Sequence, residues 1–443
     1  MSRLALQVVD LCFGDSGKGT MVDFLVRRHA ATLVVRFNGG PQAGHNVVLP
    51  DGRHHTFAQF GAGTFSPGVR TLLSRFTLIE PYALFNEADH LSALGVHDAL
   101  SRLFIDERCL VITPPQQIAN RLRERARAAA AHGTCGLGVG ECVEDALTRS
   151  DLALRAGDLR SPAIVRRKLA DMMAYKRATL ADLRSVATNE EQRVLDDPAW
   201  IDVALEACSE LAERTNILTP ENASALLRDS PISVFEGAQG VLLDEYAGFH
   251  PHTTWSETTF SNADTLLDEC GADAQRWRIG VMRTYMTRHG AGPFATEDAS
   301  LNDADLPEPH NSDDGWQSAF RRGTLDLVML RYALAVCGGV DALAVTHLDR
   351  LARLPGHACN AYDVDGTVHA ELSADNAGAR VIDESRTDLL RRAKPQFTPW
   401  PTDSDDAFVA RLECELKTPA AYRSYGPTFE SKRLADTPLS GHG

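Results

Sequence analysis

Long apolar runs, Cys-x-x-C pairs, internal repeats and low-complexity segments are all missing from this sequence. A membrane-spanning helix needs roughly 18 or more consecutive apolar residues, so no membrane partner is expected. Basic residues are in the minority: the 443 residues include 45 Lys and Arg against 60 Asp and Glu, a net charge of −15. Nucleic-acid-binding proteins usually present a basic surface, so no nucleic-acid partner is expected either.

The nine cysteines are scattered and match no disulfide framework. An odd, unpatterned set in a long chain indicates a reducing, cytoplasmic location. Cys135 and Cys142 flank a glycine-rich loop, but two cysteines without nearby partner ligands make a poor zinc site. The first residues lead directly into an apolar segment, so no signal peptide is expected.

Short apolar runs alternate with helical patterns, which predicts an α/β fold with a large, mostly parallel central sheet flanked by helices. Strands are predicted at residues 4–9, 32–37, 71–73, 103–105, 232–235, 278–282 and 343–347. In such sheets ligands bind beyond the carboxyl ends of the strands. The glycine-rich motifs follow predicted strands or lie between helices, so we expect them to converge on one crevice.

Two helices are predicted with defined limits. Residues 116–132 form one, ending at Gly133, and residues 198–215 form an amphipathic one. The chain is read as a single domain over residues 1–443, with residues 150–230 as a helical subdomain within it. Residues 300–316, rich in Asp, Asn and Pro, are predicted to form a mobile loop.

Residues 13–20 (Phe-Gly-Asp-Ser-Gly-Lys-Gly-Thr) carry the most informative motif. A strand, a glycine-rich turn and a helix in succession aim backbone N–H groups at phosphate, and Lys18 adds a cation. The spacing is shorter than in a Walker A loop. Asp15 would repel phosphate unless it binds Mg²⁺ or takes a proton, so it points to catalysis. The alternatives are an ordinary connection and a helix N-cap role for Asp15.

Four further motifs follow in order. They are Val-Arg-Phe-Asn-Gly-Gly-Pro-Gln-Ala-Gly-His-Asn at 35–46, His-Gly-Thr-Cys-Gly-Leu-Gly-Val-Gly at 132–140, Phe-Glu-Gly-Ala-Gln-Gly at 235–240 and Thr-Arg-His-Gly-Ala-Gly-Pro-Phe at 287–294. Together with residues 13–20 they resemble the adenylosuccinate synthetase family, over about residues 4–426. The resemblance implies a fold similar to P-loop NTPases and a homodimer with shared active sites.

The resemblance also implies a two-step ligase reaction. GTP phosphorylates the 6-oxygen of IMP, and L-aspartate then displaces the phosphate to give adenylosuccinate. Asp15 matches the catalytic base and ligand of one Mg²⁺ ion, the carbonyl of Gly44 matches the second metal ligand, and His45 and Gln239 match catalytic residues. Taken alone, His45 also fits a structural turn histidine.

The remaining expected contacts divide by ligand. The GTP and phosphate set is Gly14, Ser16, Gly17, Lys18, Gly19, Thr20, Gly44, Asn46, His347, Asp349, Ser424 and Gly426. The IMP set is Asn38, Gln42, Thr134, Arg149, Gln239 and Thr254, with Arg149 reaching across from the neighbouring subunit. Without the resemblance, Arg149 reads as a solvated helix charge.

Three positions depart from the family pattern. Ser16 replaces the usual glutamate beside Asp15. A related phage group that uses dGMP lacks the aspartate, so the retained Asp15 favours a substrate without a 2-amino group. His347 replaces the lysine of the guanine-reading Lys-x-Asp, and its ring would stack in place of the lysine stem, while Asp349 keeps the acceptor. In residues 314–323 only Arg321 and Arg322 remain of the arginine cluster expected to bind aspartate.

These departures leave alternative functions open. A divergent relative would activate a 6-oxopurine nucleotide for a different amine donor, or use a different nucleoside triphosphate, in specialised metabolism. A nucleotide-binding protein without turnover is disfavoured by the retained Asp15, Lys18, His45 and Gln239.

Overall fold

The computed structural model describes residues 3–271, 273–302, 304–311, 316, 319–374 and 382–435. The predicted mobile loop at 300–316 and the remodelled segment at 314–323 therefore lie in part outside the described residues.

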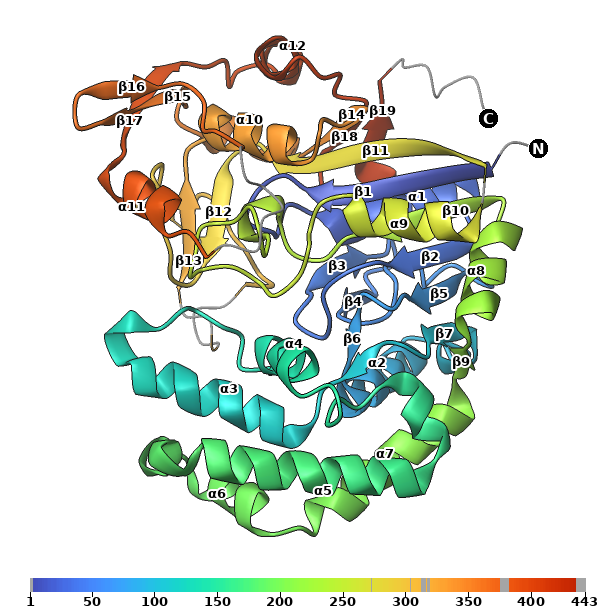
Figure 1. Cartoon of the computed structure of the whole chain (residues 1–443). Coiled ribbons are helices and arrows are strands. Elements are labelled where there is room, and N and C mark those ends of the chain that lie inside the picture. The colour runs from blue at the N-terminus through green and yellow to red at the C-terminus, as the bar shows by residue number, and fades with distance from the viewer. Residues whose placement is uncertain are drawn as a thin grey trace.

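A ten-stranded sheet forms the centre of the molecule (Figure 1). Its order across the sheet is β19 (Lys432–Leu434), β18 (Tyr422–Ser424), β14 (Ala342–Thr346), β11 (Ala274–Arg283), β1 (Arg3–Asp10), β10 (Ile232–Glu236), β2 (Leu33–Arg36), β5 (Arg70–Leu73), β7 (Leu103–Asp106) and β9 (Asn216–Leu218). Every neighbouring pair is parallel except β18 and β19. All seven predicted strands belong to this sheet, which confirms the α/β fold.

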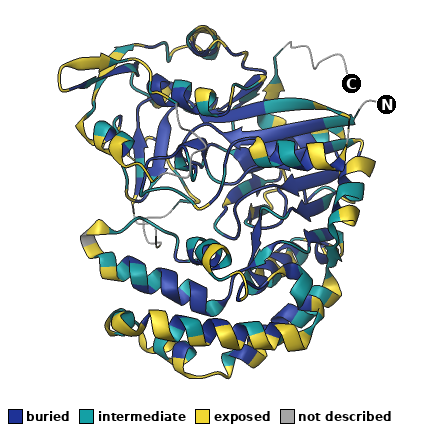
Figure 2. Cartoon of the chain, in the orientation of Figure 1, coloured by how far each residue is buried: buried dark blue, intermediate teal, exposed yellow. Residues whose placement is uncertain are grey.

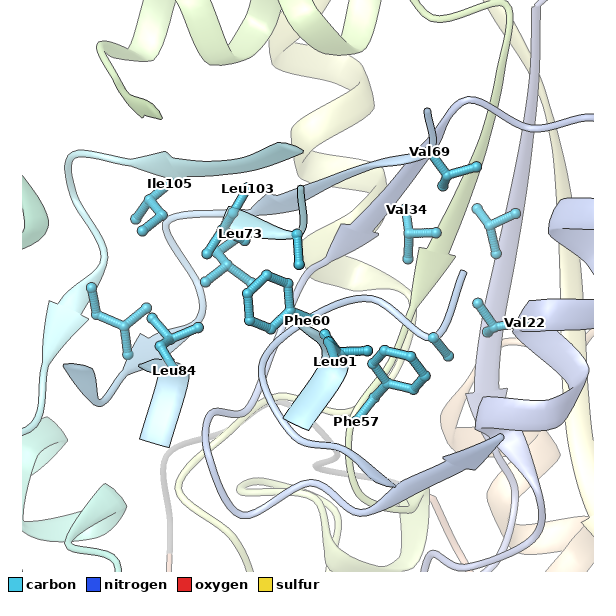
Figure 3. Packing of buried hydrophobic residues seen from close by; sticks show 14 of the residues in the cluster. Val22, Val34, Phe57, Phe60, Val69, Leu73, Leu84, Leu91, Leu103 and Ile105 are labelled. Carbon is cyan, nitrogen blue, oxygen red and sulfur yellow. The ribbon is translucent and has the colours of Figure 1, made fainter. Parts of the chain in front are cut away.

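The strands are apolar without alternation because helices cover both faces of the sheet. Alternate residues of β1 enter different cores: Leu6 and Val8 pack into one cluster, Ala5 and Val9 into the other. Figure 3 shows part of the first cluster, in which Phe57 and Phe60 pack near Val34 and Leu73. The flanking helices are α1 (Lys18–His29), α2 (Pro81–Ala93), α8 (Pro220–Asp229), α9 (Ser261–Cys270), α10 (Leu327–Val336) and α12 (Asp405–Leu416).

A group of helices lies at one end of the molecule, below the sheet in Figure 1. It comprises α3 (Pro114–Arg127), α4 (Val139–Thr148), α5 (Pro162–Thr179), α6 (Asn189–Asp196) and α7 (Trp200–Arg214), with the 3₁₀ turns η2 (Ala128–Ala130), η3 (Ala156–Arg160) and η4 (Ala181–Val186). Figure 2 shows α5 buried on one side and exposed on the other. The amphipathic helix expected at 198–215 is α7. The limit predicted for the earlier helix was wrong: α3 ends at Arg127, because Ala128 takes a φ of 49°.

Small sheets and short elements complete the chain. The sheets pair β3 (His45–Val48) with β4 (His54–Phe57), β6 (Leu78–Ile79) with β8 (Leu110–Val111), β12 (Met286–His289) with β13 (Phe320–Gly323), and β15 (His357–Val364) with β16 (Thr367–His369) and β17 (Lys394–Pro399). The other elements are η1 (Leu100–Arg102), η5 (Val241–Leu243), η6 (Leu348–Arg353), α11 (Ser385–Arg392) and η7 (Phe429–Ser431). Among the residues described, no helix has the length and apolar character to cross a membrane.

Candidate active site

A cavity of about 870 Å³ opens at the carboxyl ends of the central strands, and we call it the central cavity. The loops after β1, β2, β10, β12 and β14 and the segment before α4 all contribute to its wall. The structure thus brings the motifs of the sequence together at the edge of a parallel sheet where ligands usually bind.

Most of the residues expected at the site line this cavity. They are Gly14, Asp15, Gly17, Lys18, Gly19, Thr20, Gln42, Gly44, His45, Asn46, Thr134, Gln239, Thr254, His347, Asp349, Ser424 and Gly426. Five others lie outside the lining: Ser16, Asn38, Arg149, Arg321 and Arg322.

The glycine-rich loop at residues 13–20, which we call the phosphate loop, is hydrogen-bonded to Asp10. The sequence motifs did not single out Asp10. Asp10 is 1% exposed and accepts hydrogen bonds from Lys18 Nζ at 3.0 Å and from the Ser16 backbone N–H and Oγ, both at 2.9 Å. The side chain of Ser16 therefore bonds within the protein, and Ser16, expected among the GTP and phosphate contacts, does not line the cavity. Sequence offered one signal, an acidic residue closing an otherwise apolar strand.

Close backbone packing shapes the loop. A Cβ on Gly240 would lie 2.1 Å from the carbonyl oxygen of Cys12, so the loops after β1 and β10 touch main chain to main chain. A Cβ on Gly19 would lie 2.7 Å from the carbonyl carbon of His45. Glycine is required at both positions. A side chain at Gly240 would push the loop after β10 away from the loop after β1, and a side chain at Gly19 would push α1 away from β3.

Asp15 has a left-handed backbone with φ of 58°, a conformation that aspartate tolerates better than most residues. Burial raises the pKa of its carboxyl group, while the nearby charges of His289, Lys18 and Arg283 lower it. The carboxylate is thus desolvated beside cationic groups, as a general base would be.

His45 is fixed by a buried carboxylate that sequence reasoning did not single out. Its Nδ1 lies 2.5 Å from Oε1 of Glu236, and Oε2 of Glu236 accepts from the backbone N–H of Ala62 at 2.9 Å. Burial lowers the pKa of His45 to about 4 despite the carboxylate. The neutral ring therefore donates Nδ1–H to Glu236, which fixes its tautomer.

Stability is expected to fall below pH 6.5 because of His45. Its folded pKa of about 4 lies below the ordinary 6.5, so the unfolded chain binds the proton first. Between these values each pH unit costs the folded state about 1.4 kcal/mol from this group. Urea unfolding at pH 7.5 and 5.5 should show a smaller pH-dependent loss for His45→Asn than for the natural chain. Equal losses would show that His45 is not held neutral.

Two of the three amide side chains in the second motif, those of Asn38 and Gln42, differ in their hydrogen bonding. Both side-chain polar atoms of Gln42 are buried without a hydrogen-bond partner among the described residues, although the residue lines the cavity. Unsatisfied buried amides are rare, and a bound ligand would satisfy this one. Asn38 instead bonds the backbone of Ala238 in both directions and the carbonyl of Glu257. Asn38 therefore positions the strand end before Gln239 and does not reach the cavity.

His347 lines the cavity, and both of its ring nitrogens have hydrogen-bond partners within the protein. Its Nε2 accepts from Arg283 at 2.8 Å, and Nδ1 lies 2.8 Å from Oγ1 of Thr346. Arg283 in turn forms an ion pair with Glu308, whose carboxylate also accepts from Tyr285 at 2.6 Å. His347 is thus part of a fixed polar wall, and burial places its pKa well below the usual value.

The two arginines expected to bind aspartate do not reach the cavity. Arg321 is paired with Glu297 at 2.8 Å and donates to the carbonyls of Gly290 and Gly292. Arg322 donates to the carbonyl of Leu306 at 3.1 Å. Adjacent residues of a strand point to opposite faces, and neither of these two side chains lines the cavity, so the structure does not place them at the site.

Arg149 follows α4 on the surface, 43% exposed, with Asp151 at 2.9 Å and the ring of Tyr175 at 5.2 Å. It does not line the cavity of its own chain. That position suits a residue serving a partner's site, and it suits a solvated charge equally well.

A glycine-rich phosphate loop, a buried carboxylate and a paired histidine at the end of a parallel sheet define a nucleotide-dependent α/β enzyme. The chain matches the family model described as adenylosuccinate synthetase over residues 7–432. It therefore belongs to the adenylosuccinate synthetase family, a family of carbon–nitrogen ligases in purine biosynthesis.

Named relatives agree with this membership. The chain is 34% identical over 439 residues to adenylosuccinate synthetase of Shewanella frigidimarina, covering 96% of this chain and 97% of that protein. It is 33% identical over 367 residues to the enzyme of Desulfovibrio desulfuricans, covering 81% and 82%. These identities confirm a divergent member.

Two solved structures share the fold. The fully ligated adenylosuccinate synthetase of Plasmodium falciparum aligns with a TM-score of 0.75 at 20% identity, covering 97% of this chain and 99% of that one. The succinoaminodeoxyadenylate synthetase of cyanophage S-2L, bound to dGMP and dATP, aligns with a TM-score of 0.61 at 17% identity, covering 100% and 98%.

Proposed function

We propose that the protein forms adenylosuccinate from IMP and L-aspartate with hydrolysis of GTP, through a 6-phosphoryl-IMP intermediate. The observation that carries this proposal is the convergence of Asp15, Lys18, His45 and Gln239 on one cavity at the end of the sheet. Family membership supports the class of reaction, and the side chains support its chemistry.

In the first step the 6-oxygen of the purine becomes a nucleophile when N1 loses its proton. Asp15 takes that proton, because its carboxylate is desolvated and lies in the phosphate loop. Lys18 stabilises the transferring phosphoryl group, and Asp10 fixes its ammonium group beforehand. Phosphoryl oxygens approaching His45 favour its imidazolium form, which then donates to them.

The donor chemistry at Asp15 and Gly44 fits one Mg²⁺ ion. Asp15 lines the cavity and has no hydrogen-bond or ion-pair partner among the described residues, and Gly44 lines the same cavity. Within the described ranges no group of three or more His, Cys, Asp or Glu side chains could hold a metal. Asp15 and Gly44 would hold the ion through oxygen atoms, the ligand type that Mg²⁺ prefers. When bound, the ion neutralises charge on the nucleotide phosphates.

The two nucleotides are assigned to different parts of the cavity. Gln42, Thr134, Gln239 and Thr254 serve IMP, with the amide of Gln42 available to the purine. Asp349, Ser424 and Gly426 serve the base of GTP, because a carboxylate accepts from N1–H and the 2-amino group of guanine.

A second candidate is a relative that uses another amine donor or another nucleoside triphosphate. Two observations favour keeping it. His347 is held by Arg283 and Thr346 where the family has a lysine, and Arg321 and Arg322 lie outside the cavity. Retention of Asp15 favours IMP over a 2-amino purine.

Purified protein should be incubated with IMP, Mg²⁺ and a panel of nucleoside triphosphates and amino acids. The proposal predicts that GTP and L-aspartate give the fastest phosphate release and a product with the mass of adenylosuccinate. Product formation only with another triphosphate or amine would replace it with the second candidate. Neither phosphate nor product under any condition would reject both.

We propose further that the enzyme is a homodimer and that Arg149 acts across the interface. Mixing Arg149→Leu protein with Asp15→Asn protein is then expected to restore part of the activity, because one hybrid site retains both residues. Activity should be measured on mixed dimers isolated with two different affinity tags. A demonstrably mixed dimer without restored activity would count against a shared site.

A further inference from the structure

The carboxylates of the amino donor need a cation in the cavity, and Arg321 and Arg322 do not supply one. Each carboxylate of aspartate must leave water beside the activated purine, which is unfavourable unless a fixed charged donor receives it. Arg321 is held by Glu297 and by backbone carbonyls, and neither arginine lines the central cavity. Another cation must receive the donor's carboxylates.

The Lys and Arg side chains that line the cavity can be compared by their partners. Those that line it are Lys18, Arg123, Arg127, Arg283, Arg288 and Arg350. Five of these have a carboxylate within 4.0 Å: Asp10, Glu141, Glu124, Glu308 and Asp349, in that order. Arg288 has no such partner in the described part of the chain.

Arg288 is also buried, with 2% exposure. Its guanidinium donates to main-chain oxygens, at 3.2 Å to Ala291, 2.9 Å to Pro293 and 3.5 Å to His252. Burial and the neighbouring Arg321 lower its pKa to about 9. A buried cation beside a cavity and without a counter-ion is costly unless an anion arrives to pair with it.

The position of Arg288 suits the second step of the proposed reaction. Its guanidinium carbon lies 4.2 Å from the centre of the Phe13 ring, and Phe13 opens the loop that carries Asp15. Arg288 stands opposite Arg321 in the pairing of β12 with β13, but Arg288 lines the cavity and Arg321 does not. The cation thus lines the cavity and packs against the first residue of the loop that carries the proposed catalytic base.

We infer that Arg288 binds a carboxylate of the amine donor. This inference rests on the proposed function. Arg288 would then bind the carboxylate that the resemblance assigned to the arginine cluster at residues 314–323. A competing explanation is that Arg288 only holds the turn at residues 290–293 through its carbonyl bonds.

Arg321 provides a matched control, because it bonds carbonyls of the same turn, Gly290 and Gly292, from outside the cavity. Arg288→Met, Arg288→Lys and Arg321→Met should be compared with the natural chain. KM should be measured for L-aspartate, IMP and GTP. Hydroxylamine, an amine nucleophile without a carboxylate, should be tested as an alternative donor.

Arg288→Met is expected to raise KM for aspartate about 10- to 100-fold, the range of a charge-assisted hydrogen bond. Its KM for IMP and GTP, and its kcat/KM with hydroxylamine, should stay within about twofold. Arg288→Lys should recover part of the loss, and Arg321→Met should show no donor-specific effect.

The inference is overturned if Arg288→Met leaves KM for aspartate unchanged, if it weakens IMP or GTP equally, or if Arg321→Met has the same donor-specific effect. A natural chain that forms product with a carboxylate-free amine but not with an acidic one also overturns it, while leaving the activation chemistry intact. A natural chain that activates no purine rejects the proposed function itself, and the assignment of Arg288 falls with it.

Discussion

Replacing Asp15 by Asn is expected to lower turnover about 10²- to 10⁴-fold, the usual cost of losing a general base. The amide keeps the shape of the side chain and tolerates the left-handed backbone at φ 58°. It accepts no proton from N1 and is a weaker ligand for Mg²⁺. Steady-state kinetics, with GTP binding followed by calorimetry, should show lost turnover and retained nucleotide affinity. A rate above about a tenth of the natural value would contradict the assignment.

The same substitution has an expected effect of opposite sign on stability. Burial raises the pKa of Asp15, so the ionised carboxylate is disfavoured in the empty folded protein at neutral pH. Asn removes that charge, and the unfolding midpoint should stay equal or rise. A variant that loses both activity and stability would instead show that Asp15 supports the structure.

Asp10→Ala is expected to lower the free energy of unfolding by about 3–5 kcal/mol, the range for breaking a buried ion pair. It leaves the ammonium of Lys18 without its counter-ion, and it removes the acceptor of the Ser16 and Cys12 backbone N–H groups. Activity should fall as well, because the phosphate loop rests on this carboxylate. Urea denaturation followed by circular dichroism measures the change.

An exposed ion pair gives the control for Asp10. Asp51 pairs with Arg53 at 2.8 Å, with 53% of its side chain exposed. Asp51→Ala should leave the free energy of unfolding nearly unchanged, because solvent screens an exposed ion pair. If the two substitutions cost the same, the buried pair does not stabilise the loop as described.

The parts of the fold that sequence predicted are those set by local pattern. Strands buried on both faces, such as β1 and β10, appear as continuous apolar runs, and the glycine-rich turns after them mark the site. The end of α3 was mispredicted because Gly133 supplied a familiar stop signal. The backbone of Ala128, with a φ of 49°, ends α3 five residues earlier, and alanine carries no stop signal of its own.

The parts of the site that sequence missed depend on contacts between distant residues. Glu236 meets His45 across 191 positions of the chain, and Asn38 meets Ala238 across 200. The motif does not show that the Asn38 amide is hydrogen-bonded to the backbone, nor that the Gln42 amide, four residues later, has no partner among the described residues. Arg321 is held by Glu297 and by the carbonyls of Gly290 and Gly292, contacts between distant residues that only the folded chain reveals.

In the proposed reaction the 6-oxygen of IMP is phosphorylated and then leaves the purine as part of the released phosphate. The most direct measurement uses IMP labelled with ¹⁸O at position 6, incubated with GTP, L-aspartate, Mg²⁺ and the enzyme, and follows the released phosphate by mass spectrometry. Each released phosphate is expected to carry one ¹⁸O atom, because Asp15 and the phosphate loop activate that oxygen for phosphorylation. The amount of labelled phosphate should equal the amount of adenylosuccinate. Unlabelled phosphate released alongside product would contradict it.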